Sequence, residues 1–143
     1  MTLIVKTIAR LVAGFIVLYG IYVVLYGHIS PGGGFAGGVI MAGAFILVCL
    51  AFGKDFVFRL FSQAAASVWD CVGGLAFLGI ALVGYLKGEF FLNLLAKGTP
   101  FRLFSAGTIP LSNIAIGVKV GSALFAVFAA LALFREHSGE EKK

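Results

Sequence analysis

The chain has 143 residues, of which 61% are hydrophobic and only 12% are charged, and its mean hydropathy is +1.08. A soluble domain carries about 25% charged residues, so the composition excludes a soluble domain and indicates a protein whose solvent is the lipid bilayer. The aromatic content of 14% excludes a disordered chain. The net charge of +5 arises from cations that do not gather on a polar face, so we expect no binding to nucleic acid.

Two membrane-spanning helices are predicted in the first third of the chain. No Asp, Glu, Lys or Arg occurs from Leu11 to Gly53, a stretch about twice as long as the roughly 20 residues that one helix needs to cross the hydrocarbon core. Glycine and proline residues break this stretch in its middle, and Ser30 followed by Pro31 is typical of a helix start. We place the two spans at about residues 8–27 and 31–52.

Two further spans are predicted in the rest of the chain. An apolar stretch closes at Lys87, and a second one begins near Pro110 and ends before Arg135. The predicted fold class is therefore an all-α integral membrane protein with four transmembrane helices in a single domain, residues 1–143. The remaining boundaries are spans at 64–86 and 110–134, an interfacial segment over 90–107, and a polar tail over 135–143.

The distribution of cations predicts the orientation in the membrane. Lys and Arg are enriched in the cytoplasmic segments of membrane proteins. With the N terminus inside, the outer segments hold only Lys87, Lys97 and Arg102. The inner segments then hold Lys6, Arg10, Lys54, Arg59, Arg135, Lys142 and Lys143. Both termini are therefore expected in the cytoplasm.

A glycine-rich segment at the start of the second span has two readings. Gly32, Gly34 and Gly37 have the G-x-G-x-x-G spacing of dinucleotide-binding proteins, but that motif requires a preceding β-strand, and a membrane helix precedes it here, so we expect no nucleotide. Glycines spaced by four residues instead allow helix backbones to approach closely in lipid. The predicted helix-packing motif comprises Pro31, Gly32, Gly33, Gly34, Phe35, Gly37 and Gly38, with Gly117 and Gly121 on the fourth span.

Lys119 is the first candidate for an ion path. It lies about 13 Å along the fourth span, at 1.5 Å per residue from Pro110, and so close to the middle of the bilayer. An ammonium group there costs about 3 kcal/mol on insertion scales, so it must meet a carboxylate, a water-filled cavity or another subunit. A proton relay and a purely structural pair are both open interpretations. Asp70 is the candidate partner within the chain, although the neighbouring Trp69 also fits a shallower, interfacial position.

Asn113 and His28 are weaker candidates. Asn113 shares one face of the fourth span with Gly117 and Gly121. His28 ends the first span, where a hydrogen-bonded cap is the more common role for a lone histidine, and no second ligand lies at a metal-binding spacing. The chain offers no Ser-His-Asp, Cys-His or paired-carboxylate arrangement, so we expect neither a metal site nor an enzyme.

A distinctive string joins the first two predicted spans and carries a family resemblance. It reads YGHISPGGGFAGGVI over residues 26–40 and matches the pattern G-H-x-x-P-G-G-G-F-x-G-G at every fixed position. This string resembles the signature of the MnhB/MrpB family of membrane subunits, and the length and four-helix plan of the chain agree. The last span departs from the antiporter-type pattern, in which an aspartate precedes a glycine, because this chain has Asn113 and adds Lys119.

The resemblance implies a subunit of a multisubunit Na⁺/H⁺ antiporter of the Mrp type, or of a membrane-bound hydrogenase or related respiratory complex that contains the same module. The departure in the last span favours the hydrogenase-type relatives. The resemblance further implies that other membrane subunits are the partners, that Na⁺ and H⁺ are the ions moved, and that any redox cofactors lie in partner subunits, with none in this chain. The expected location is the plasma or inner membrane.

Three functions follow as alternatives. The first is a non-catalytic subunit that contributes to Na⁺/H⁺ translocation. The second is a purely structural subunit that joins the functional halves of such a complex without lining an ion path. The third, a small multidrug-type exporter, also fits four spans, but it requires an acidic residue in the first span, and residues 11–27 contain none.

Overall fold

The computed structural model describes residues 2–53, 56, 58–59, 61–93, 95 and 106–140. All regular structure in this part of the chain is helical. The helices are α1 (Leu3–Leu25), α2 (Gly33–Phe52), α4 (Gln63–Val83), the short 3₁₀ helix η1 (Gly84–Lys87) and α5 (Ile109–Glu140).

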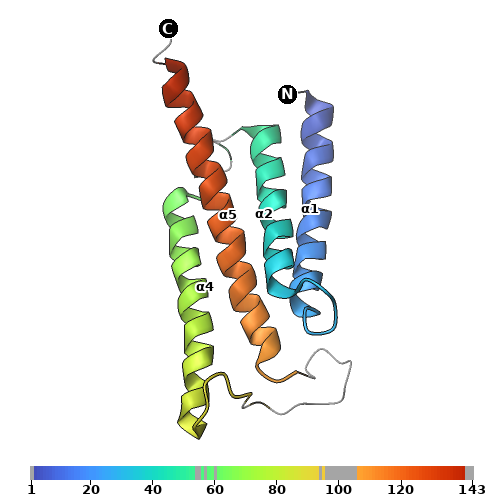
Figure 1. Cartoon of the computed structure of the whole chain (residues 1–143). Coiled ribbons are helices and arrows are strands. Elements are labelled where there is room, and N and C mark those ends of the chain that lie inside the picture. The colour runs from blue at the N-terminus through green and yellow to red at the C-terminus, as the bar shows by residue number, and fades with distance from the viewer. Residues whose placement is uncertain are drawn as a thin grey trace.

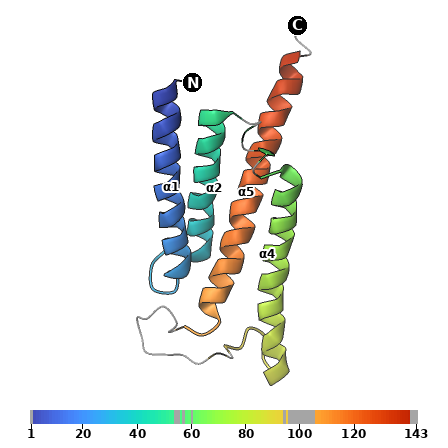
Figure 2. The same ribbon diagram turned by 180° about the vertical axis from the view of Figure 1, so that it is seen from behind.

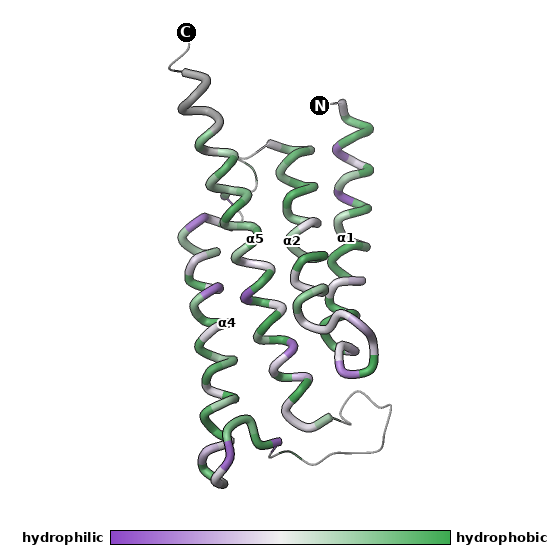
Figure 3. Tube along the Cα trace, in the orientation of Figure 1, coloured by the Kyte–Doolittle hydropathy of each residue, from purple (hydrophilic) through white to green (hydrophobic). Residues whose placement is uncertain are grey.

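Four of these helices are long and apolar enough to cross a membrane, which confirms the predicted fold class and a multi-pass membrane protein. Their apolar windows have mean hydropathies between 1.8 and 2.4. Figure 3 shows that the helices are mostly hydrophobic along their length, with isolated hydrophilic positions in α1, α4 and α5. Such sparsely charged helices satisfy their own backbone groups and leave apolar side chains for lipid or for neighbouring subunits.

The helices lie side by side in the order α1, α2, α5, α4, and α5 runs parallel to α2 and antiparallel to α4 (Figures 1 and 2). Close packing joins α1 to α2, α2 to α5, and α5 to α4, while α1 touches α5 more lightly. Among the described helices, α4 therefore packs chiefly on α5. The position of α4 depends on the residues of that single seam.

Several boundaries differ from those predicted. The first helix begins at Leu3 rather than near residue 8, because the apolar residues before Lys6 continue the helix. The second begins at Gly33 rather than Pro31: Gly32 and Gly33 adopt φ values of 117° and 54°, which glycine alone adopts readily. Ser30 does not cap this helix, because its hydroxyl donates to the carbonyl of Tyr26 at 3.1 Å.

The C-terminal region also differs, since α5 continues as a helix to Glu140, where a polar tail was predicted from residue 135. The first glycine after the apolar stretch is Gly139, so nothing in the sequence breaks the helix earlier.

The predicted interfacial segment 90–107 falls largely outside the described residues. Its two described ends are tied together by Asn93. The side-chain amide of Asn93 donates to the carbonyl of Ala106 at 3.0 Å, and its oxygen accepts from the backbone N–H of Thr108 at 2.9 Å. These two hydrogen bonds hold the residues just before α5 next to Asn93, in the segment that follows η1.

Both termini lie at the same end of the bundle (Figure 1), as four crossings require, and the cytoplasmic side remains a prediction. A chain with Cys49 and Cys71 replaced by alanine and a new cysteine at Ser138 is expected to resist an impermeant maleimide added to intact cells. A cysteine at Ser30, in the connection between α1 and α2, is expected to react. Labelling at Ser138 together with protection at Ser30 would show that the orientation in the membrane is the reverse of the predicted one.

Candidate functional site

The structure brings Lys119 and Asp70 together as an ion pair between α5 and α4. Lys119 Nζ lies 2.7 Å from Asp70 Oδ1 and donates a hydrogen bond to it. Lys119 lies near the middle of the apolar stretch Ile109–Ala132, and Asp70 lies in the second turn of α4. The partner of Lys119 within the chain is therefore Asp70.

Two adjacent glycines on α4 make this contact possible. A Cβ on Gly73 would lie only 2.8 Å from the backbone nitrogen of Lys119 and 3.0 Å from the carbonyl oxygen of Ala115, so the backbones of α4 and α5 meet there. A Cβ on Gly74 would lie 3.7 Å from Lys119 Nζ and Cδ. Because Gly74 has no side chain, Lys119 can extend over it to reach Asp70, which lies one helical turn before Gly74 on α4.

The ion pair lies at the edge of the seam between α4 and α5. The side chain of Lys119 is 49% exposed and that of Asp70 is 31% exposed. The pair is thus reachable from outside the chain, and its two charges neutralise each other locally. A cation that enters from that side would compete with the Lys119 ammonium for the same carboxylate.

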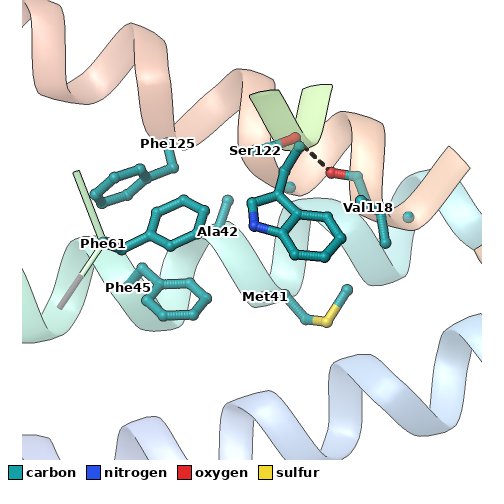
Figure 4. Close-up of a pocket in the computed structure, with 10 residues that line it drawn as sticks. Met41, Ala42, Phe45, Phe61, Val118, Ser122 and Phe125 are labelled. Carbon is teal, nitrogen blue, oxygen red and sulfur yellow. Dashed lines mark hydrogen bonds between the residues drawn. The ribbon is translucent and has the colours of Figure 1, made fainter. Parts of the chain in front are cut away.

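The other side of α5 carries an apolar cavity (Figure 4). Its volume is about 190 Å³, and Figure 4 shows Met41, Ala42, Phe45, Phe61 and Phe125 around it. The one hydroxyl at this cavity, that of Ser122, donates to the carbonyl of Val118 at 2.6 Å. Apart from this hydroxyl and the indole of Trp69 the lining is apolar and uncharged, so among the described residues the candidate ion site is the pair of Lys119 and Asp70. The full lining is Met41, Ala42, Phe45, Phe61, Trp69, Gly117, Val118, Gly121, Ser122 and Phe125.

The glycine motif joins α2 to α5 within the chain. A Cβ on Gly38 would lie 2.7 Å from the carbonyl oxygen of Gly117 and 3.1 Å from the backbone nitrogen of Gly121. Gly34 meets the backbone carbonyl of Asn113 even more closely. These contacts leave no room for a side chain on this face of α2.

A second glycine face joins α2 to α1. A Cβ on Gly37 would meet the side chain of Val24 and would lie 2.9 Å from the carbonyl oxygen of Gly20. The helix α2 is consequently held on two sides by backbone-to-backbone contact. Of the other motif residues, Phe35 is 63% exposed, and Pro31 is exposed in the turn before α2.

The four candidate ion-path residues do not form one site. Asn113 belongs to the glycine contact: its side-chain oxygen accepts from the backbone N–H of Gly34 at 3.4 Å, and its amide nitrogen would lie 2.8 Å from a Cβ on Gly27. His28 is half-buried in the connection between α1 and α2. The structure thus separates these two residues from the pair of Lys119 and Asp70.

Sequence reasoning missed Gly73, Gly74 and Ser122. The signal for the two glycines was present, because they follow Asp70 by three and four residues and so lie on the same face of α4. Within the described part of the chain, no three His, Cys, Asp or Glu side chains gather to hold a metal ion.

The comparison with protein families decides which family the chain represents. A family model described as a domain related to the MnhB subunit of Na⁺/H⁺ antiporters matches residues 4–126. The chain belongs to the MnhB family. The resemblance drawn from the glycine string is therefore confirmed, and the family is one of antiporter subunits.

Relatives of this MnhB-family chain come from archaea and bacteria. It is 36% identical over 126 residues to the protein MJ1307 of Methanocaldococcus jannaschii, which covers 83% of this chain and 48% of that protein. It is 46% identical over 52 residues to a Staphylococcus aureus (strain Newman) protein that bears the name antiporter subunit mnhB2, covering 36% of this chain and 37% of the relative. The chain thus spans about half or less of these relatives.

A solved structure shares the fold. A chain of the membrane-bound sulfane sulfur reductase, an archaeal respiratory membrane complex, matches with a TM-score of 0.77 and 31% identity. The match covers 92% of this chain and 58% of that chain. The four-helix arrangement is therefore similar to that of a subunit in a respiratory membrane complex.

Proposed function

We infer that this MnhB-family chain is a non-catalytic membrane subunit that contributes to Na⁺/H⁺ translocation in a multisubunit complex of the respiratory or antiporter type. The single observation that carries the proposal is the ion pair between Lys119 and Asp70 at membrane depth. Ionisable residues inside membrane spans are costly, and they commonly mark ion or proton pathways.

The chemistry of the pair suits coupled exchange. An oxygen of a carboxylate can accept either a hard cation such as Na⁺ or a hydrogen bond from an ammonium group. When Lys119 releases its proton, Asp70 is left with a negative charge that favours entry of a cation; when Lys119 takes a proton up, it displaces that cation. The pair would therefore bind the two ions alternately. We assign any redox cofactors of such a complex to partner subunits and none to this chain.

A structural role is the second candidate, and a specific observation favours it. The helix α4 packs chiefly on α5, and the ion pair crosses the seam between them. In that case the pair fixes the position of α4, and the subunit joins other parts of the complex without moving ions.

The substitution Asp70→Asn separates the two functions. The amide preserves the shape of the side chain and an acceptor for Lys119, but it removes the charge. We expect the complex to assemble in full and Na⁺-driven proton movement in proteoliposomes to fall at least about tenfold, as for loss of one charge-assisted interaction. Transport equal to that of the parent complex would support the structural role instead. As a control, Gln63→Glu adds a charge at the first residue of α4, at the very end of the span, and should leave transport unchanged.

A further inference from the structure

We propose that a transmembrane helix of another subunit packs along the seam between α4 and α5, on the side of Lys119 and Asp70, and presents a neutral amide or hydroxyl side chain to the pair. The inference rests on the proposed place of the chain in a multisubunit complex, and it does not depend on ion movement.

The first argument is energetic. The side chains of Lys119 and Asp70 are 49% and 31% exposed, respectively, on the outside of the chain, and Lys119 lies near the middle of an apolar span. Lipid tails cannot solvate either charge, and each unsatisfied polar group in hydrocarbon costs several kcal/mol in general. A bundle surrounded only by lipid would leave this cost unrelieved, so a protein surface covers the pair.

The hydrogen-bond inventory specifies the chemistry of that surface. An ammonium group has three donors, and among the described residues the structure gives Lys119 Nζ one acceptor, Asp70 Oδ1. Asp70 Oδ2 takes no part in that bond. An amide or hydroxyl group can accept from Lys119 and donate to Asp70 at once, and it adds no net charge to a pair that is already neutral.

The residues around the pair are small enough for a helix to approach. Ser67 and Gly74 lie within one turn of Asp70 on α4, and Ala123 lies one turn after Lys119 on α5. Small residues are typical of the surfaces at which membrane helices associate. The opposite side of the same seam is different, since a wholly apolar cavity of about 310 Å³ opens there beside Val72 and Ile114.

Site-specific photo-crosslinking in the native complex tests the location. Benzoylphenylalanine at Ser67 or Ala123 is expected to form an adduct with another subunit, whereas the same group at Val72 or Ile114 is expected to form none. These two control positions lie on the same helices but on the apolar side of the seam. Absence of a subunit adduct from Ser67 and Ala123, or equal adducts from all four positions, would overturn the inference.

An apolar pair tests the chemistry. The double variant Lys119→Met/Asp70→Leu removes both charges together, which generally leaves a fold as stable as before or more so. We expect the chain to remain monodisperse in detergent while recovery of the complex falls about tenfold, because the partner loses its hydrogen bonds. Unchanged recovery would mean that lipid covers the pair, and would contradict the inference.

The two proposals can fail separately. If the crosslinks are absent and Asp70→Asn still lowers transport, the proposal that a partner helix covers the pair is wrong and the proposed function stands. If the crosslinks form and Asp70→Asn transports normally, the pair is an interface without an ion path.

Discussion

Gly38→Leu is expected to prevent the chain from forming a stable four-helix bundle. The added Cβ alone would lie 2.7 Å from the carbonyl oxygen of Gly117 and 2.9 Å from Cβ of Val120. Because the first of these atoms is backbone, α2 and α5 must separate to make room. Overpacking of this kind costs about 1–3 kcal/mol for small insertions, and the Leu side chain adds three more carbons. Loss of most of the folded chain in detergent is therefore expected.

The matched control lies on the same helix. Gly43 has nothing within 4 Å of the position of its Cβ, and it has a helical backbone, so Gly43→Leu is expected to leave stability nearly unchanged. Size-exclusion profiles and thermal unfolding of the two purified variants make the comparison. Similar profiles for both would show that the glycine face of α2 does not hold the bundle together.

The four spans could be predicted because they depend on composition alone. Uninterrupted apolar stretches of about 20 residues have few alternatives to a membrane helix, and all four are present in the structure. The boundaries depend on backbone details that composition does not report. The helix α2 begins at Gly33 and not at the predicted Pro31 because two successive glycines adopt positive φ. The helix α5 extends to Glu140 because polar residues can continue a helix beyond the apolar span.

The candidate site was predicted in part. Lys119 could be singled out because a charge in the middle of an apolar span is rare, and Asp70 because it is an acid with apolar sequence on both sides. Their contact could not be predicted from the sequence, because the two residues are 49 positions apart and meet only through the packing of α4 on α5. Sequence spacing also could not show that Asn113 serves the glycine contact, where it accepts from Gly34.

The packing partners of the glycines in α2 could not be predicted from the sequence either. Four-residue spacing predicted that α2 packs closely, but it did not identify the helix or subunit that α2 packs against. The structure assigns Gly34 and Gly38 to α5 and Gly37 to α1, both within the chain. Besides the seam that carries Lys119 and Asp70, the outer face of α1 remains for lipid or for other subunits, and it includes Phe15 and Leu18, each 65% exposed.

Lys119→Arg is expected to abolish most of the transport without affecting assembly. A guanidinium retains the positive charge and can bind Asp70 in a bidentate manner, and the bare surface of Gly74 leaves space beside it. It does not release its proton under physiological conditions, whereas a lysine ammonium can do so. A variant that preserves the pair but blocks proton release therefore isolates the proposed relay from every structural role of Lys119.

The decisive measurement is Na⁺-driven proton movement by the purified complex in proteoliposomes, compared between the parent and Lys119→Arg at equal amounts of assembled complex. The proposed role predicts at least about a tenfold lower rate, which corresponds to roughly 1.4 kcal/mol in the transport barrier, with unchanged subunit composition. A rate equal to that of the parent would contradict the claim that proton exchange at Lys119 contributes to translocation.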